Sequence, residues 1–338
     1  MAKKKKKREP GAKPFPLLRF DRLKTYPLAR GKRKVSASAF AGLHVPGDSF
    51  KAFLDRLPPI LAASDLRAVI ERVATAARAG RTVIVGLGAH VIKVGLSPIV
   101  IDLMARRVIS CVAMNGAGVV HDLEIALAGR TSEEVLEELE TGRFGMARDT
   151  AEHIHAAVAR CAREGLGYGR AVGGYILRER FPHRDLSILA QAERLGIPVT
   201  VHVAIGTDIH HMHASADGAA LGAASLADFR TFCEAVATIE HGAYLNVGSA
   251  VILPEVFLKA VSVARNLGHP LRRFTTVNLD FLRHYRTTMN VVTRPVARGG
   301  KGFHLTGPHE ILLPLIAAGV IERLGQRMPH GRSRARRG

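Results

Sequence analysis

The strongest constraint on the fold is a unit that recurs along most of the chain. Each unit has an apolar run suited to a β-strand, a turn containing glycine, and an amphipathic run suited to a helix. Residues 81–90 (RTVIVGLGAH) give a strand and its turn, and residues 96–107 (LSPIVIDLMARR) give the helix that follows. Parallel strands need a long crossover, which such a helix supplies. We therefore predict an α/β fold with a doubly wound parallel sheet and helices on both faces.

Hydrophobic periodicity extends this unit along the chain. A short apolar run indicates a strand, whereas apolar residues three and four positions apart indicate a helix. Strands are predicted within residues 81–90, 108–118, 197–206, 243–251 and 273–281. Helices are predicted within residues 65–80, 96–107, 121–129, 132–142, 148–165, 183–196, 225–242, 254–268 and 309–325.

Positive charge is concentrated at the two ends of the chain. The formal net charge is +20 at pH 7, and residues 1–34 alone contain 14 Lys and Arg against 2 Asp and Glu. We predict a disordered basic arm at 1–34, one folded domain at 35–325, and a disordered basic tail at 326–338. Such ends either keep a protein dispersed in water or contact a polyanion without sequence preference.

Targeting and redox features favour a cytoplasmic protein. The first residues lack the apolar core of a signal peptide, and no apolar run is long enough for a membrane span. Cys111, Cys161 and Cys233 are far apart and match no metal-binding spacing, as in reduced intracellular proteins. We therefore expect a protein that works in the cytoplasm without a membrane partner.

Polar loops rich in glycine follow the predicted strands. They fall at residues 86–90, 115–122, 206–213 and 248–255, with a further loop at 297–310 before the last helix. All strands of a parallel sheet end at one edge, so these loops are expected to meet where open α/β sheets bind ligands. Glycine lets a phosphate approach bare N–H groups, although Gly86-Leu87-Gly88 is only half of the dinucleotide-binding motif. The loops predict a nucleotide or dinucleotide site.

Four histidines lie close together within residues 199–218: His202, His210, His211 and His213. Zinc needs three or four converging ligands, and the segment contains no established zinc motif, so we assign no metal site. Histidines also form structural hydrogen bonds, and a histidine in a cleft can transfer protons because imidazole titrates near neutral pH. The histidines are therefore structural residues of the cleft, proton carriers or, without a recognisable motif, metal ligands.

The order and spacing of these loops resemble the deoxyhypusine synthase family over about residues 65–325. The likeness is carried by residues 83–127 (from VIVGLGAH to HDLEIAL), 196–213 (GIPVTVHVAIGTDIHHMH), 248–257 (GSAVILPEVF) and 306–320 (TGPHEILLPLIAAGV). Members of this family bind NAD, form tetramers and move an aminobutyl group from spermidine to a protein lysine. The resemblance implies a Rossmann-like, NAD-binding fold, a small-molecule substrate and a homotetramer.

The resemblance also implies which loops hold NAD. They are the turns after the first two strands, the Asp208 loop, and the loop before the last helix. The corresponding residues are Gly88, Ala89, His90, Asn115, Gly116, Ala117, Gly118, Asp208, Pro308 and His309.

The catalytic positions differ from the family pattern. Pro254-Glu255 stands where the family has a histidine that helps to deprotonate substrate, and Val120-His121 stands where it has two acids. The chain has no tryptophan, and Lys301 in GGKG is the lysine nearest to the family's nucleophile. Lys301 is expected to form an imine or to contact a phosphate. The predicted acid–base set is Asp208, His211, His213, Glu255 and Lys301.

Two functions follow from these observations. The first is an NAD-dependent enzyme that transiently dehydrogenates a small amine or alcohol, with or without transfer of a group afterwards. The second is a non-catalytic nucleotide-binding module whose basic arms dock it to RNA or another polyanion.

Overall fold

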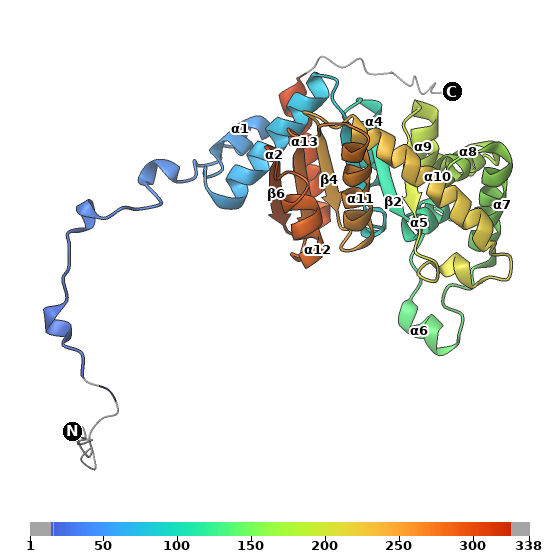
Figure 1. Cartoon of the computed structure of the whole chain (residues 1–338), viewed down its shortest axis with the longest axis horizontal. Helices are drawn as coiled ribbons and strands as arrows, with labels where there is room; N and C mark the ends of the chain where they lie inside the picture. Colours follow the sequence, from blue (N-terminus) through green and yellow to red (C-terminus); the bar gives the residue numbers. More distant parts are fainter. Residues whose placement is uncertain (1–14, 16, 326–338) are drawn as a thin grey trace, which may run out of the picture. The chain divides into compact units, whose positions relative to one another are not determined.

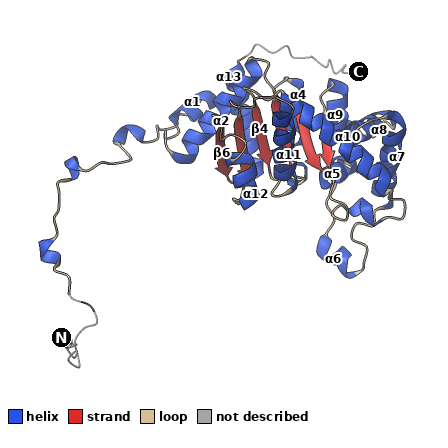
Figure 2. Cartoon of the chain, in the orientation of Figure 1, coloured by secondary structure: helices blue, strands red, loops and turns tan. Residues whose placement is uncertain are grey.

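Six parallel strands form one sheet in the order β3-β2-β1-β4-β5-β6, which confirms the predicted doubly wound α/β fold (Figure 2). The computed structural model describes residue 15 and residues 17–325. Residues 1–14, 16 and 326–338, which hold part of the predicted basic arm and all of the predicted tail, lie outside the described residues. The strands are β1 (Val83–Leu87), β2 (Cys111–Asn115), β3 (Val199–His202), β4 (Ala243–Val247), β5 (Thr275–Asp280) and β6 (Lys301–Thr306).

Helices connect the strands and cover both faces of the sheet (Figure 1). In the second helix, Leu66, Val69, Ile70 and Val73 recur at helical spacing and are buried, as expected for an amphipathic helix. The helices are α1 (Phe50–Arg56), α2 (Leu61–Arg78), α3 (His90–Lys93), α4 (Ser97–Ala105), α5 (Gly116–Ala128), α6 (Val135–Glu140), α7 (Arg148–Glu164), α8 (Tyr168–Arg178), α9 (Ile188–Leu195), α10 (Gly218–Ala237), α11 (Ile252–Asn266), α12 (Tyr285–Thr287) and α13 (His309–Leu324). Shorter helical segments are η1 (Phe20–Arg22), η2 (Leu28–Arg30), η3 (Ala37–Ala39), η4 (Arg184–Leu186), η5 (Ile209–Met212) and η6 (Thr288–Thr293).

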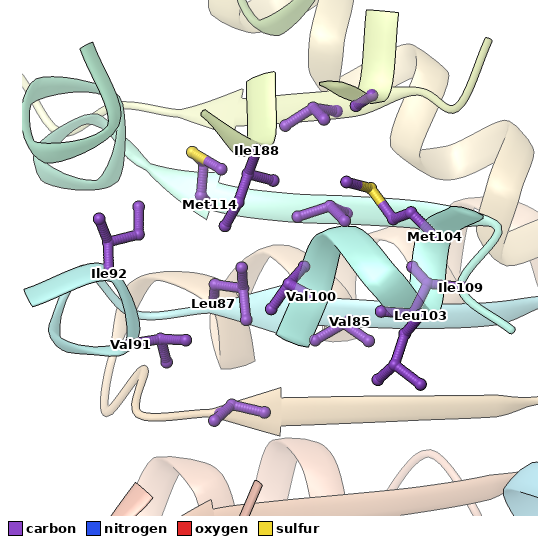
Figure 3. Close-up of a cluster of buried hydrophobic side chains, with 14 of the residues drawn as sticks. Val85, Leu87, Val91, Ile92, Val100, Leu103, Met104, Ile109, Met114 and Ile188 are labelled. Atoms are coloured by element: carbon purple, nitrogen blue, oxygen red, sulfur yellow. The ribbon is translucent and has the colours of Figure 1, made fainter. Parts of the chain in front are cut away.

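Successive side chains of a strand point to opposite faces of the sheet, so the strands contribute to two apolar layers. Val85 and Leu87 of β1 belong to one layer, whereas Ile84 between them belongs to the other. Figure 3 shows part of the first layer, in which Leu103 of α4 packs beside β1. Phe257 of α11 lies in the second layer. A parallel sheet needs this burial on both faces, since helices cross over each of them.

The sixth strand corrects the sequence prediction, which places residues 297–310 in a loop. Lys301–Thr306 pairs in parallel with β5 along its whole length. Within β6 only Phe303 and Leu305 are buried, because an edge strand has one face toward solvent. The pairing places Lys301 at the amino edge of the sheet and Thr306 at the carboxyl edge.

The chain divides into two units between Phe40 and Ala41, slightly beyond the predicted boundary after residue 34. The described part of the first unit contains η1, η2 and η3, and none of its described residues is buried. The second unit contains the sheet and its helices. Among the residues that the structure describes, no helix has both the length and the apolar character needed to cross a membrane.

Candidate functional site

The strand order reverses between β1 and β4, and the loops after these two strands are in contact. The N–H of Gly88 donates to the carbonyl of Val247 at 2.8 Å. A β-carbon on Gly88 would overlap the carbonyl of Gly248, so only glycine lets the loops come this close. Open α/β sheets bind ligands at such a reversal. Gly88, Ala89 and His90, which the sequence predicts to contact a cofactor, therefore lie at this reversal of strand order.

His309 begins α13 beside these loops and is 1% exposed. Its Nε2 donates to the carbonyl of Leu279 at 3.2 Å, so the neutral ring has its acceptor at Nδ1. Within the described residues, this Nδ1 has no hydrogen-bond partner. The ring centroid lies 5.7 Å from that of His90 and 6.3 Å from that of Phe281. A buried acceptor without a partner is a place where a ligand N–H or O–H can bind.

Asp208 is held at the amino end of α5. Asn115 caps this helix, because its side chain accepts the N–H of Gly118 at 3.1 Å. The Asp208 carboxylate fills the space that a β-carbon on Gly116 would need. The helix dipole favours a negative charge at this end. At residues 115–118, where the sequence predicts cofactor contacts, the structure therefore places the carboxylate of Asp208.

The Asp208 carboxylate keeps an oxygen available beside a histidine. Burial raises the pKa of Asp208 to about 6, although the nearby Ala117 N–H and the Thr207 hydroxyl lower it. Among the described residues, its Oδ2 has no hydrogen-bond partner, and His211 Nε2 lies 3.8 Å away. His211 Nδ1 accepts the N–H groups of Gly206 and Asp208 at 3.2 and 3.3 Å, which leaves the proton on Nε2. Asp208 Oδ2 is thus a buried acceptor without a partner among the described residues.

The other histidines of this segment have structural contacts. His210 Nε2 bonds the hydroxyl of Tyr168 at 2.9 Å, and burial lowers the pKa of His210 to about 3. Burial likewise lowers the pKa of His202 to about 4. His213 Nε2 donates to the carbonyl of Gly145 at 2.8 Å. Across residue 15 and residues 17–325, no group of three or more His, Cys, Asp or Glu is suited to hold a metal ion.

A cavity of about 200 Å³ lies beside Asp208. Its lining includes Lys93 of α3, His121 and Glu124 of α5, and Glu133, so carboxylates outnumber cations. α3 connects this cavity to the strand reversal, because its first residue approaches His309 and its last residue lines the cavity. The lining suits a small ligand that carries positive charge or hydroxyl groups.

His121 is oriented in this cavity by a hydroxyl and a carboxylate. Its Nδ1 lies 2.7 Å from the hydroxyl of Thr131, which in turn donates to Glu124. Thr131 therefore accepts the Nδ1–H, which leaves a lone pair on Nε2. Thr150 also donates to Glu124, at 3.0 Å. Burial raises the pKa of Glu124, but the nearby His121 together with hydrogen bonds from Thr131 and Thr150 outweighs burial and lowers this pKa. A histidine held through its Nδ1 in this way can act as a general base.

The structure does not bring the whole predicted acid–base set together. Lys301 lies at the opposite edge of the sheet, which corrects its predicted place beside Asp208. Glu255 lies in the first turn of α11, where its carboxylate pairs with Arg286 at 3.1 Å and accepts the Asn290 amide at 2.8 Å. Lys259, followed by Arg286, lowers the pKa of Glu255. Asp208, His211 and His213 belong to one loop and its η5 turn. The Glu255 carboxylate instead forms ion pairs with Lys259 and Arg286, and Lys301 lies at the opposite edge of the sheet from Asp208.

Sequence reasoning missed Lys93 and Glu124 and left His121 outside the catalytic set. The available signal was the spacing of His121 and Glu124, since residues three apart on a helix share a face. Thr131 lies beyond the end of α5, so its bridging position could not be read from that spacing.

No protein-family model matches the chain, and no curated protein sequence matches it. Among solved structures, the chain is similar to a proposed LOR/SDH protein from Methanococcus maripaludis S2, with a TM-score of 0.48, 15% identity, and 83% of this chain and 72% of that chain covered. It is also similar to a proposed deoxyhypusine synthase from Entamoeba histolytica, with a TM-score of 0.47, 10% identity, and 81% and 93% covered. For a complex of AgrE with ornithine and NAD+, the TM-score is 0.46 at 16% identity, with 78% and 34% covered. These likenesses concern the arrangement of helices and strands, and the membership of a family stays a prediction.

Proposed function

We propose that the protein is an NAD-binding enzyme that transiently removes hydrogen from a small amine or alcohol at the carboxyl edge of the sheet. One observation carries the proposal: a single cavity, connected to the strand reversal through α3, contains an oriented histidine, His121, and a buried carboxylate, Asp208. Dinucleotides bind at such reversals in open α/β sheets.

Several groups at this edge fit NAD. Asp208 Oδ2 can accept a ribose hydroxyl, the usual role of an acidic residue in dinucleotide-binding folds. His309 Nδ1 can accept an amide N–H, and the contacting loops at Gly88 and Gly248 offer backbone without side chains. The amino end of α5 is taken by Asp208, so the diphosphate would lie against the glycine loops. When bound, NAD would supply the hydride acceptor.

His121 would take the proton that the reaction releases. An alcohol, or an amine that binds as its ammonium form, must lose a proton from oxygen or nitrogen when its carbon gives up hydride to the cofactor. Nε2 of His121 is the free acceptor, and Glu124 stabilises the protonated ring through Thr131. Glu133 would hold an ammonium or hydroxyl group of the substrate in the same cavity. The excess of carboxylates favours an amine.

Thermal unfolding with and without NAD tests the cofactor part of this proposal. A ligand present at about 100 times its dissociation constant stabilises the folded state by about 2.7 kcal/mol, which is readily seen as a rise in Tm. Asp208→Asn is expected to reduce the rise, and Asp217→Asn at the exposed cap of α10 is the matched control that keeps it. An unchanged Tm in millimolar NAD would contradict the proposal.

A second candidate is a nucleotide-binding module without catalysis, docked to RNA or another polyanion through its basic arm. It is favoured by the described part of that arm, where Arg19, Arg22 and Arg30 are exposed. Binding of a polyanion that weakens steeply with salt and disappears on deletion of residues 1–34 would support it. Turnover of any small amine with NAD would instead favour the enzyme.

A further inference from the structure

A second cavity, of about 470 Å³, lies at the amino edge of the sheet, away from the candidate active site. Its cations come from three elements that are distant in the sequence: Arg72 from α2, Arg273 from the segment before β5, and Lys301 from the start of β6. The strand register brings these elements together, because Thr275 pairs with Ala243 on one side and with Lys301 on the other. Lys301 therefore lies in a cavity that is separate from the proposed NAD site.

Two of these cations approach one aromatic ring. The guanidinium carbon of Arg72 lies 5.7 Å from the ring centroid of Phe303, and Nζ of Lys301 lies 5.8 Å from it. Phe303 is buried in the sheet, so it holds both cationic ends near a fixed point. Like charges that share one cavity repel each other unless an anion binds between them. The arrangement therefore favours a negatively charged ligand.

The acids around this cavity already have partners. Glu71 is the one acid among the described residues that line it, and it pairs with Arg323 at 3.5 Å. Glu240 accepts the backbone N–H groups of Arg272 and Arg273 at 2.6 and 3.0 Å. The three cations thus exceed the acidic charge of the lining, and the Arg72 guanidinium is also fixed by a hydrogen bond to the Thr275 hydroxyl at 3.5 Å.

The backbone of the cavity is closely packed and partly strained. His241, which also lines it, has a φ of +63°, in the left-handed region that residues with a β-carbon rarely adopt. A β-carbon on Gly242 would overlap the carbonyl of Thr82, and one on Gly300 would crowd the carbonyl of Phe274. Left-handed non-glycine residues gather at ligand sites, because the surrounding structure holds them there.

We propose that this cavity is a binding site for the phosphate groups of a diphosphate or triphosphate. Arginine binds two phosphate oxygens at once, and lysine adds a point charge, so Arg72, Arg273 and Lys301 match adjacent phosphates better than they match a single carboxylate. The volume falls within the range of about 300–1,000 Å³ that is usual for small-molecule sites. The site is independent of the proposed NAD site, since the two lie at opposite edges of the sheet.

Isothermal titration of the full-length protein with inorganic pyrophosphate in low-salt buffer tests this site. Saturable binding is expected, and Lys301→Gln or Arg273→Gln is expected to weaken it by about tenfold or more. Arg230→Gln, which removes an exposed arginine of α10, is the matched control and is expected to change the affinity by less than about twofold. Circular dichroism of each variant checks that the fold is kept.

Two outcomes would overturn the proposal: no saturable binding at millimolar pyrophosphate, or equal weakening by all three substitutions, which would indicate diffuse attraction to a basic protein. Competition by a single-stranded oligonucleotide identifies the source of the phosphate. Displacement of pyrophosphate assigns the site to nucleic-acid backbone, and persistence assigns it to a free phosphate compound. Neither result depends on NAD binding, so failure here and failure at the carboxyl edge are separate findings.

Discussion

The carboxylate of Asp208 occupies the space beside Gly116 that any other residue at position 116 would need for its β-carbon. Gly116→Ala is therefore expected to displace Asp208 from the amino end of α5 and to lower the free energy of unfolding by about 1–3 kcal/mol. The same variant is expected to lose the NAD-dependent rise in Tm. Urea denaturation measures the first effect. Gly174→Ala within α8, where a β-carbon meets open space, is the control and is expected to be neutral or stabilising.

Burial of His202 predicts a loss of stability in acid. Its pKa is lowered from 6.5 to about 4 by burial, so below pH 6.5 the unfolded chain binds a proton that the folded chain does not. The stability that His202 contributes is therefore complete above pH 6.5 and is lost as the pH falls toward 4, by about 3 kcal/mol over the interval. His202→Gln is expected to remove this part of the pH dependence. Urea denaturation of both proteins between pH 7 and pH 4 measures it, and parallel curves would contradict it.

Asp228 of α10 is a structural carboxylate that joins β3 to α8. It accepts the N–H groups of Gly169 and Val201 at 2.9 and 2.7 Å, while burial raises its pKa to about 7. Asp228→Ala leaves these buried donors without partners and is expected to lower the free energy of unfolding by about 3 kcal/mol or more. Asp217→Ala removes an exposed helix cap and is expected to lower it by about 1 kcal/mol. Equal losses in urea denaturation would refute the role given to Asp228.

The proposed role of His121 predicts that substitutions at His121 and at Thr131 lower kcat to different extents. For any small amine that reduces NAD with this protein, His121→Gln is expected to lower kcat by about 10²–10⁴-fold, because the proton acceptor is lost. Thr131→Val keeps His121 but breaks its link to Glu124, so a smaller loss with a shifted pH profile is expected. The rise in Tm with NAD is expected to persist in both. An unchanged kcat in His121→Gln would exclude it as the base.

The sheet could be predicted from the sequence because short strand-like runs alternate with helical segments, and the residues of β1 to β5 are almost all buried. β6 could not, since it is an edge strand with only Phe303 and Leu305 buried and with glycines before it. That omission also misplaced Lys301: a loop would have carried it to the carboxyl edge, whereas six residues of strand separate the two edges by about 17 Å.

Some contacts of the candidate site could likewise be predicted from the sequence, and others could not. The approach of His309 to the loops after β1 and β4 follows from parallel topology, which brings all carboxyl ends to one edge. The hydrogen bond between His121 and Thr131 depends on how the chain turns after α5, and the paired state of Glu255 depends on Arg286, 31 residues away. Such contacts depend on tertiary packing, which cannot be predicted from the spacing of residues within one segment of the sequence.

α3 is four residues long, yet its first residue lies against the ring of His309 and its last lines the cavity beside Asp208. A ligand at the strand reversal and a ligand in this cavity would therefore both contact α3. We therefore expect the affinity for a ligand at the strand reversal and the affinity for a ligand in the cavity beside Asp208 to be coupled, each ligand changing the binding of the other by the same factor.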